Sequence, residues 1–137
     1  MQTTLFSYPV RIKEQHLDTF GHVNNATYLV LLEEARWELL NNGGFGIKKI
    51  QETGIGPTIL SITINFSREL VLHDEIIIET QTKSYNKKIG VLAHRMIRNG
   101  EICCTAEFVM GLFDLRLRKL IMPTPEWLHM LGVIQPS

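Results

Sequence analysis

The sequence lacks several features that would direct it to particular compartments or partners. Its 137 residues contain no apolar run long enough to cross a bilayer, so we expect no membrane association. The segment 1–6 has neither a charged n-region nor a continuous apolar stretch, which argues against a secretory signal peptide. Acidic and basic residues number 14 each, so no large field of one sign favours nucleic acid or an anionic membrane as a partner.

Cysteine is scarce, and the two that occur, Cys103 and Cys104, are adjacent. Neighbouring residues of a strand point to opposite faces, so these two side chains are poorly placed to pair with each other. Reduced thiols are typical of intracellular proteins, and we therefore predict a cytoplasmic location, with the cysteines serving in packing. The sequence also lacks a Gly-x-Ser-x-Gly motif, which leaves a serine hydrolase mechanism without support.

Apolar residues make up 45% of the chain, enough for a core, and the length fits a single domain spanning residues 1–137. A long helix is expected after a polar loop, because apolar side chains recur there three and four residues apart: Tyr28, Leu31, Leu32, Ala35 and Leu39. Asn24 or Asn25 can cap its first turn, and the segment 41–44 is expected to end it. Most of this helix is apolar, so we expect a sheet to wrap around it.

The other segments with apolar periodicity indicate strands and two short helical pieces. Strands are predicted at 6–12, where Pro9 favours an edge, and at 60–66, 75–82, 89–98 and 102–115, with a hairpin turn at Asn99-Gly100. Helical pieces are predicted at 45–53 and after Thr124. Two strands are each expected to bury one face, formed by Leu60, Ile62, Ile64 and Phe66 in the first and by Ile102, Cys104, Ala106, Phe108, Met110 and Leu112 in the second. The order of elements predicts an α+β fold.

The loop before the long helix concentrates polar groups, namely Asp18, Gly21, His22, Asn24 and Asn25. Asp18 therefore stands just ahead of a helix N-terminus, whose free N–H groups and partial positive charge suit a developing oxyanion. Loops before helices are also rich in Asp, Gly and Asn simply because turns and caps require them. From composition alone, a structural role and a catalytic role both stay open.

A known family signature resembles this loop and the helix that follows it. Hotdog-fold acyl-CoA thioesterases of the 4-hydroxybenzoyl-CoA thioesterase family carry a pattern similar to Asp18-x-x-Gly21-His22-Val23-Asn24-Asn25-x-x-Tyr28, followed by Glu33-Glu34-Ala35-Arg36. The segments 64–70 and 73–75 also resemble the second strand of that family and the turn after it. The resemblance implies a hotdog fold, in which a five-stranded antiparallel sheet wraps around a long central helix. It further implies a homodimer with its sheets joined edge to edge and active sites at the interface, with a dimer of dimers as the open alternative.

The resemblance also implies roles for individual residues. Asp18 falls at the position of the catalytic carboxylate, and Asn25 at the position whose backbone N–H polarises the thioester carbonyl. His22 is a further catalytic candidate that would orient water or hold Asp18; the alternative is a loop histidine bonded to backbone. Contacts with the substrate are expected from Gly21, Val23, Asn24, Tyr28 and Phe66, and contacts with coenzyme A phosphates from Lys87 and Lys88. Core packing is the alternative for the two aromatic residues, and a solvated surface is the alternative for the lysines.

The chemistry of a thioester suits so small a set of groups. Its carbonyl is electrophilic and a thiolate leaves readily, so one carboxylate and an oxyanion stabiliser suffice. Asp18, ionised at neutral pH, could attack the carbonyl to give a mixed anhydride or take a proton from water, and both routes stay open. No cofactor or metal is expected, since the spacing of His16, Asp18 and His22 matches no standard zinc site.

The leading prediction is therefore an acyl-CoA thioesterase that hydrolyses its substrate to a carboxylic acid and coenzyme A. The alternatives are a thioesterase acting on acyl groups held by acyl carrier protein and a non-catalytic module that binds acyl-CoA. A hotdog dehydratase is less favoured, because the motif Asp-x-Asn-Pro-x-His, which such enzymes carry, is absent from the sequence.

Overall fold

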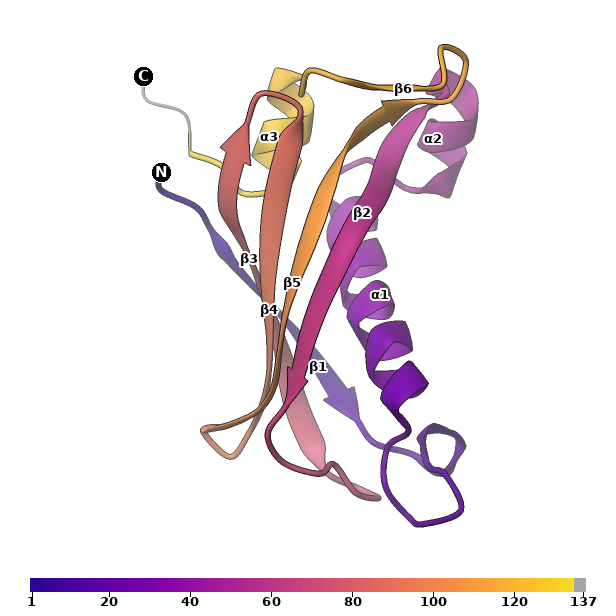
Figure 1. The fold of residues 1–137 in the computed structure, drawn as a ribbon, viewed down its shortest axis with the longest axis vertical. Helices are drawn as coiled ribbons and strands as arrows, with labels where there is room; N and C mark the ends of the chain where they lie inside the picture. Colours follow the sequence, from indigo (N-terminus) through magenta and orange to yellow (C-terminus); the bar gives the residue numbers. More distant parts are fainter. Residues whose placement is uncertain (135–137) are drawn as a thin grey trace.

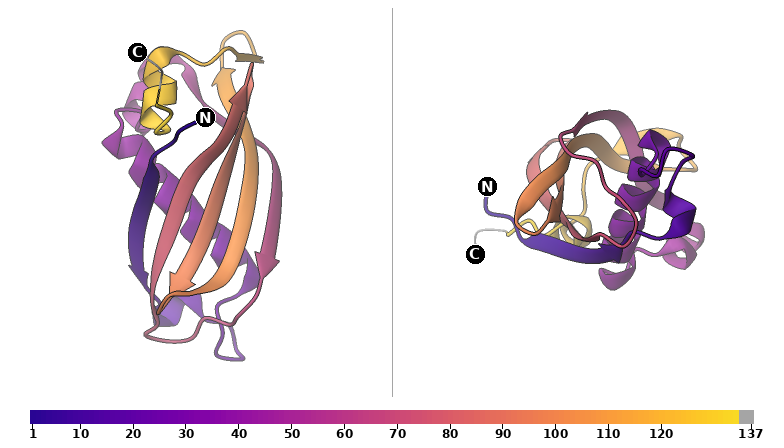
Figure 2. Two further views of the ribbon diagram at one scale, coloured as in Figure 1. Left: turned by 90° about the vertical axis from the view of Figure 1, so that its left-hand side faces the viewer. Right: turned by 90° about the horizontal axis from the view of Figure 1, so that it is seen from below.

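One long helix, α1 (Asn25–Asn42), lies against the concave face of a curved antiparallel sheet in the computed structural model, which describes residues 1–134 (Figure 1, Figure 2). The five long strands lie in the order β1-β3-β4-β5-β2. A short sixth strand, β6, pairs with β5 beyond the end of β4. This arrangement confirms the predicted α+β hotdog fold, with one short strand added to the expected five. The bounds of the strands are Leu5–Arg11 (β1), Ile55–Phe66 (β2), Glu75–Asn86 (β3), Ile89–Arg98 (β4), Glu101–Asp114 (β5) and Lys119–Ile121 (β6).

The helices begin and end at the residues whose chemistry permits it. Asn24 caps α1, because its side-chain oxygen accepts a hydrogen bond from the Ala26 N–H at 2.9 Å. The other helices are a 3₁₀ turn η1 (Glu14–His16), α2 (Ile47–Thr53) and α3 (Pro125–Met130), the last capped by Thr124. None of the helices formed by residues 1–134 combines the length and the apolar character that a membrane crossing requires. The helical piece predicted at 45–53 starts two residues late, because Phe45 is buried against Trp127 ahead of the helix.

The core forms between α1 and the inward side chains of β3, β4 and β5. The predicted face of α1 is confirmed, since Tyr28, Leu31, Leu32, Ala35 and Leu39 are all buried, as is Leu40. Facing residues of the sheet complete this core, namely Ile76, Ile78, Leu92, Met96, Cys104, Ala106, Phe108, Met110 and Leu112. Each large apolar side chain buried in this way contributes about 1.5–3 kcal/mol, so this contact holds the helix in place.

The expected burial of one face of β2 is wrong for the single chain. β2 is an edge strand, and four of its apolar side chains are 37–49% exposed: Ile59, Leu60, Ile62 and Phe66. The pairing of β2 with β5 also skips Leu60, which forms a bulge. A bulge resets the alternation of side chains, so Ile59 and Ile62 line the same cavity although they are three residues apart. The period of two that the sequence predicted for 60–66 is therefore broken at its first residue.

A second irregularity lies in β5, where the pairing with β4 steps from Met96–Cys104 to Ile97–Ile102 and skips Cys103. Cys103 and Cys104 are both buried and both free. Ile102, which was expected on the buried face, is exposed because the bulge changes the phase of the strand at that point. The other five predicted residues of that face are buried.

Two neighbouring residues of α1 test the role of its buried face. We expect Leu31→Ala to lower the free energy of unfolding by about 2–5 kcal/mol, because the Leu31 side chain is 0% exposed and its removal leaves a cavity. The matched control is Val30→Ala, since Val30 is 52% exposed on the same helix and its loss should change that free energy by less than about 0.5 kcal/mol. Urea denaturation at one fixed protein concentration measures both. Equal effects of the two changes would contradict this account of the core.

Candidate functional site

The loop that precedes α1 is held in one shape by its own backbone. The Asp18 N–H donates to the His22 carbonyl at 2.9 Å, and Leu17 and Val23 form an isolated bridge. The loop is also tied to the segment after β2, because the Val23 N–H donates to the Leu70 carbonyl at 3.0 Å. Gly21 has φ of 84°, a left-handed conformation that glycine adopts without strain. The positive φ at this position gives a physical reason for the glycine of the sequence motif.

The Asp18 carboxylate is positioned by the same turn. Its Oδ1 atom accepts hydrogen bonds from the backbone N–H of Phe20 at 2.9 Å and of His22 at 3.4 Å. Its Oδ2 atom accepts no hydrogen bond from residues 1–134. The side chain is half-buried, so one oxygen is fixed by the loop while the other remains available to a ligand.

The first N–H of α1 is also available. Within the described part of the chain, no group accepts a hydrogen bond from the backbone N–H of Asn25, whereas the next amide, Ala26, is used by the Asn24 cap. Free N–H groups at a helix start carry partial positive charge and bind anions or polarised carbonyl oxygens. Asn25 thus offers an unpaired donor at the end of an 18-residue helix.

Asp18 and Asn25 line one open cavity of about 270 Å³. Most of the predicted site residues lie there together, namely Asp18, His22, Val23, Asn25, Tyr28 and Phe66. Gly21 and Asn24 belong to the same loop but do not line the cavity. Burial raises the pKa of the Tyr28 hydroxyl, so this group stays protonated at neutral pH. Three further lining residues were given no role by sequence reasoning, Ser67, Arg68 and Glu69, although they follow the strand on which the family resemblance rests.

His22 and Glu69 are in contact on the wall of this cavity, with 3.3 Å between His22 Nε2 and Glu69 Oε2. Both side chains are largely exposed, so this contact orients the ring more than it stabilises the fold. Arg68 is turned away to Glu101, at 2.8 Å between Nε and Oε2. No three His, Cys, Asp or Glu side chains gather in a metal-binding arrangement anywhere in residues 1–134.

The two lysines predicted to contact coenzyme A lie elsewhere. Lys87 and Lys88 form the turn between β3 and β4, at the end of the sheet near α3 (Figure 1). The loop that carries Asp18 lies at the opposite end of the molecule (Figure 1). A single chain therefore does not bring these lysines to Asp18.

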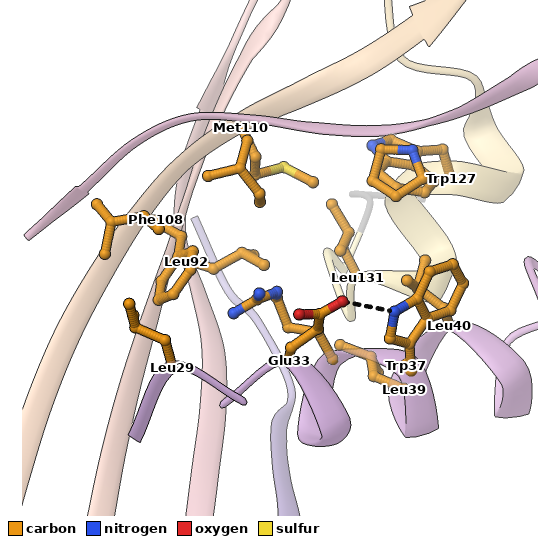
Figure 3. A pocket seen from close by; sticks show the side chains of 14 residues that line it. Leu29, Glu33, Trp37, Leu39, Leu40, Leu92, Phe108, Met110, Trp127 and Leu131 are labelled. Atoms are coloured by element: carbon orange, nitrogen blue, oxygen red, sulfur yellow. Dashed lines mark hydrogen bonds between the residues drawn. The ribbon is translucent and has the colours of Figure 1, made fainter. Parts of the chain in front are cut away.

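A second cavity, of about 350 Å³, lies farther along α1 and is mostly apolar (Figure 3). It is bounded by α1, β2 and the inward side chains of the sheet, with Leu29, Leu40, Ile62, Phe108, Met110 and Trp127 among its walls. Glu33 lies on the helix side, where its Oε1 accepts a hydrogen bond from Trp37 Nε1 at 3.3 Å (Figure 3). No sequence pattern predicted this cavity, because its lining depends on the bulge in β2.

Arg36, which lines the second cavity, and the buried His94 both contact the ring of Phe108. The Arg36 guanidinium stacks 4.0 Å from the centre of the Phe108 ring, and His94 meets the same ring edge-on at 5.0 Å. His94 is 1% exposed, and its Nδ1 is 3.0 Å from Thr80 Oγ1. Burial, and then the charge of Arg36, lower the pKa of His94 to about 3. The sequence does carry a signal for the burial of His94, because it falls in the alternating inward-facing series of β4, Gly90, Leu92, His94 and Met96.

Comparison with known proteins gives a consistent result. The family model described as the thioesterase-like superfamily matches residues 10–130. Long-chain acyl-CoA thioesterase FadM of Escherichia coli K12 is 32% identical over 114 residues, covering 82% of this chain and 86% of that protein. Acyl-CoA thioester hydrolase YbgC of Escherichia coli O6:H1 is 28% identical over 97 residues, 71% of this chain and 72% of that protein. The crystal structure of the probable thioesterase YbaW from Escherichia coli superimposes with a TM-score of 0.80 and 31% identity, over 91% of this chain and 95% of that one.

The buried His94 predicts how stability depends on pH. Its pKa is lower in the folded chain than in the unfolded one, so the unfolded state binds the proton first as pH falls below about 6.5. The contribution of the neutral His94 to the free energy of unfolding is therefore fully present above that pH. It is lost progressively toward pH 3, by at most about 1.4 kcal/mol per pH unit, since one proton is involved. We expect His94→Gln to flatten the difference in unfolding free energy between pH 6.5 and 5, measured by urea denaturation. Identical pH profiles of the two proteins would show that His94 does not titrate on unfolding.

Proposed function

This chain belongs to the thioesterase-like superfamily, and from that premise we propose that it hydrolyses acyl-CoA thioesters to a carboxylic acid and coenzyme A. The observation that carries the proposal is the cavity that Asp18 and Asn25 both line, together with the backbone N–H of Asn25, which has no acceptor among residues 1–134. The match over residues 10–130 and the 32% identity to FadM support the class of reaction.

The N-terminus of α1 is proposed to bind the carbonyl oxygen of the thioester. As the carbonyl becomes tetrahedral, negative charge develops on that oxygen, and a fixed N–H donor stabilises it without reorganisation. The Asn25 N–H supplies such a donor, and the dipole of the long helix α1 adds partial positive charge at the same place. The side chain of Asn25 has no part in this role.

Asp18 is proposed to supply the carboxylate of the reaction. Two backbone N–H groups hold Oδ1, so the carboxylate keeps its orientation, while Oδ2 accepts no hydrogen bond from residues 1–134 and stays free for the substrate. Oδ2 then attacks the carbonyl carbon and is released from the anhydride by water, or it takes a proton from the attacking water. Both routes expel the coenzyme A thiolate, and both remain part of the proposal.

The surrounding groups are proposed to shape the entrance. His22, oriented by Glu69, would hold water near Asp18. The rings of Tyr28 and Phe66 meet edge-on at 4.9 Å and would contact the start of the acyl chain. Gly21, Val23 and Asn24 act through the shape of the loop and the helix cap, which keep Asp18 and Asn25 together.

Asp18→Asn tests the catalytic proposal with little change of structure. Asparagine keeps a side-chain oxygen that can accept the Phe20 and His22 hydrogen bonds, but it is a poor base and nucleophile. We expect kcat/KM for acyl-CoA hydrolysis to fall at least about a hundredfold, with the thermal unfolding midpoint nearly unchanged. Release of free thiol from acyl-CoA measures the rate.

The matched control is Asp114→Asn. Asp114 Oδ1 accepts two backbone N–H bonds, from Arg116 and Leu117, in a turn of the same kind but away from this cavity. Its substitution should leave hydrolysis within about twofold of the unsubstituted protein. Full activity of the Asp18→Asn protein would remove Asp18 from the mechanism, and tight binding of acyl-CoA without turnover would favour a binding module.

We also propose that the protein acts as a homodimer joined through β2. An exposed edge strand of 12 residues with four exposed apolar side chains offers unpaired backbone groups and apolar area to a second copy. Strands related by a two-fold axis pair antiparallel, so the end of one protomer that carries Lys87 and Lys88 lies at the same end as Asp18 of its partner. This placement supports a contact of these lysines with coenzyme A phosphates. A dimer of dimers remains the alternative assembly.

Leu60→Lys tests the β2 interface. A lysine on the exposed edge of β2 would place a charge in the joint between sheets, so we expect the dimer to dissociate at concentrations where the unsubstituted protein stays paired. Sedimentation velocity measures the assembly. The control is Ile77→Lys, because Ile77 is 46% exposed, close to the 49% of Leu60, but lies on the inner strand β3. A dimer that survives Leu60→Lys, or one that Ile77→Lys disrupts instead, would place the interface elsewhere.

A further inference from the structure

The wall of the cavity that Asp18 lines continues from β2 into the β2–β3 connection (residues 67–74), and the sheet holds this connection at a bulge. Ser67 and Arg68 line the cavity, and their backbone N–H groups both donate to the Cys103 carbonyl, at 2.9 and 3.1 Å. Cys103 is the residue that the pairing of β4 with β5 skips, and a bulged residue is left unpaired in the ladder. The bulge in β5 therefore provides an anchor for the cavity wall.

The loop before α1 is attached to the β2–β3 connection at three points. The Val23 N–H donates to the Leu70 carbonyl at 3.0 Å, and His22 forms an isolated bridge with Val71. The third point is the side chain of His22, whose Nε2 lies 3.3 Å from Glu69 Oε2. The position of the loop, and of the carboxylate that it carries, therefore depends on where the connection lies.

Arg98, the last residue of β4, holds the far part of the β2–β3 connection. Its Nη1 donates to the Glu69 carbonyl at 2.9 Å and to Asp74 Oδ2 at 2.7 Å. The same Oδ2 accepts the Val71 N–H at 2.9 Å, and the Asp74 N–H donates to the Val71 carbonyl at 3.1 Å. One guanidinium nitrogen thus ties both ends of this turn to the sheet.

The pair formed by Arg98 and Asp74 is the best shielded of those that arginine and lysine form within residues 1–134. Its side chains are 24% and 18% exposed, whereas Arg95 in the pair with Glu79 on the same strand is 45% exposed. Charge-assisted hydrogen bonds are strong, and salt screens them little when water has limited access. Arg98 is not part of the cavity lining within the described chain, so an effect on turnover has to pass through the connection.

We propose that Arg98 is a positioning residue for hydrolysis, because it fixes the β2–β3 connection and thereby keeps Asp18 beside the N-terminus of α1. This inference rests on the proposed function. The last link is the Asp18 N–H, which donates to the His22 carbonyl at 2.9 Å, so a displacement of His22 is passed on to Asp18. A shift of about 1 Å in a reacting group can cost about a hundredfold in rate. The apolar cavity has no lining residue in common with the connection, so binding of the acyl group is not affected in the same way.

Arg98→Gln tests this role by removing the charge that holds the connection. We expect kcat for acyl-CoA hydrolysis to fall at least about tenfold while KM stays within about twofold. Arg98→Lys should recover kcat to within about threefold, since a single Arg98 nitrogen makes both bonds and an ammonium also carries enough donors. Release of free thiol at varied acyl-CoA concentration measures both constants. A rise of KM with unchanged kcat, or an Arg98→Lys protein as slow as Arg98→Gln, would overturn the proposal.

The matched control is Arg95→Gln. Arg95 lies three residues earlier on β4 and also pairs with a carboxylate, that of Glu79, but it makes no contact with the β2–β3 connection. Its substitution should leave kcat within about twofold of the unsubstituted protein. An equal loss in both variants would show that any ion pair of β4 has this effect, and the specific role of Arg98 would be refuted.

Amide hydrogen exchange tests the same link without catalysis. In the Arg98→Gln protein we expect the N–H groups of Asp18 and Val23 to lose at least about tenfold in protection, while Phe108 at the centre of β5 keeps its protection. A loss of the same size at all three amides would indicate a general loss of stability and would count against the proposal. Should Arg98→Gln not fold, the same selective loss is expected for Asp74→Asn, which removes the charge but keeps an acceptor.

Failure of the proposed function and failure of this inference give different results. If the unsubstituted protein releases no thiol from any acyl-CoA, the function fails, and the exchange measurement still decides whether Arg98 holds the loop. If the unsubstituted protein hydrolyses acyl-CoA and the Arg98→Gln protein turns over as fast, the function stands and the positioning role is refuted.

Discussion

Burial of one face of α1 against the sheet decides where the free end of that helix points. Each large side chain in that face contributes about 1.5–3 kcal/mol, whereas the Asn24 cap contributes about 1 kcal/mol. Packing therefore sets the position and direction of the helix, and the cap only decides at which residue it begins. Asn25, the first residue of the helix, lines the same cavity as Asp18, and its backbone N–H is unpaired within residues 1–134. The two groups that we propose to take part in catalysis are thus placed by apolar contacts at some distance from them.

Much of this architecture could be predicted from local patterns. The buried face of α1, a cap at Asn24 or Asn25 and the Asn99-Gly100 hairpin depend on residues close in sequence, and each is found, with Asn24 as the cap. Asp18 and Asn25 were predicted together because one short loop and one helix start carry both. The same locality explains why Gly21, with its positive φ, was identifiable as part of the motif.

What could not be predicted depends on pairing between distant strands. The bulges at Leu60 and Cys103 exist only because β5 meets β2 on one side and β4 on the other, and no short segment of sequence reveals them. Each bulge changes which side chains face inward. A simple alternation with a period of two therefore predicts neither the apolar cavity nor the exposure of Ile102. Arg36 was seen only as part of a motif, since its stacking on Phe108 joins two residues 72 positions apart (108 − 36).

The two cysteines have a practical consequence for measuring this enzyme. Both thiols are buried in the core, and burial raises the pKa of Cys104 to about 11, so Cys104 carries little thiolate at neutral pH. Thiolate is the form that attacks disulfide reagents, and a reagent in solution has no path to either sulfur in the folded chain. A colorimetric reagent can therefore stay in the reaction mixture throughout and count each coenzyme A molecule as it leaves. A slow rise of colour in the absence of substrate would then measure unfolding of the chain, which exposes the two cysteines, and not hydrolysis of a thioester.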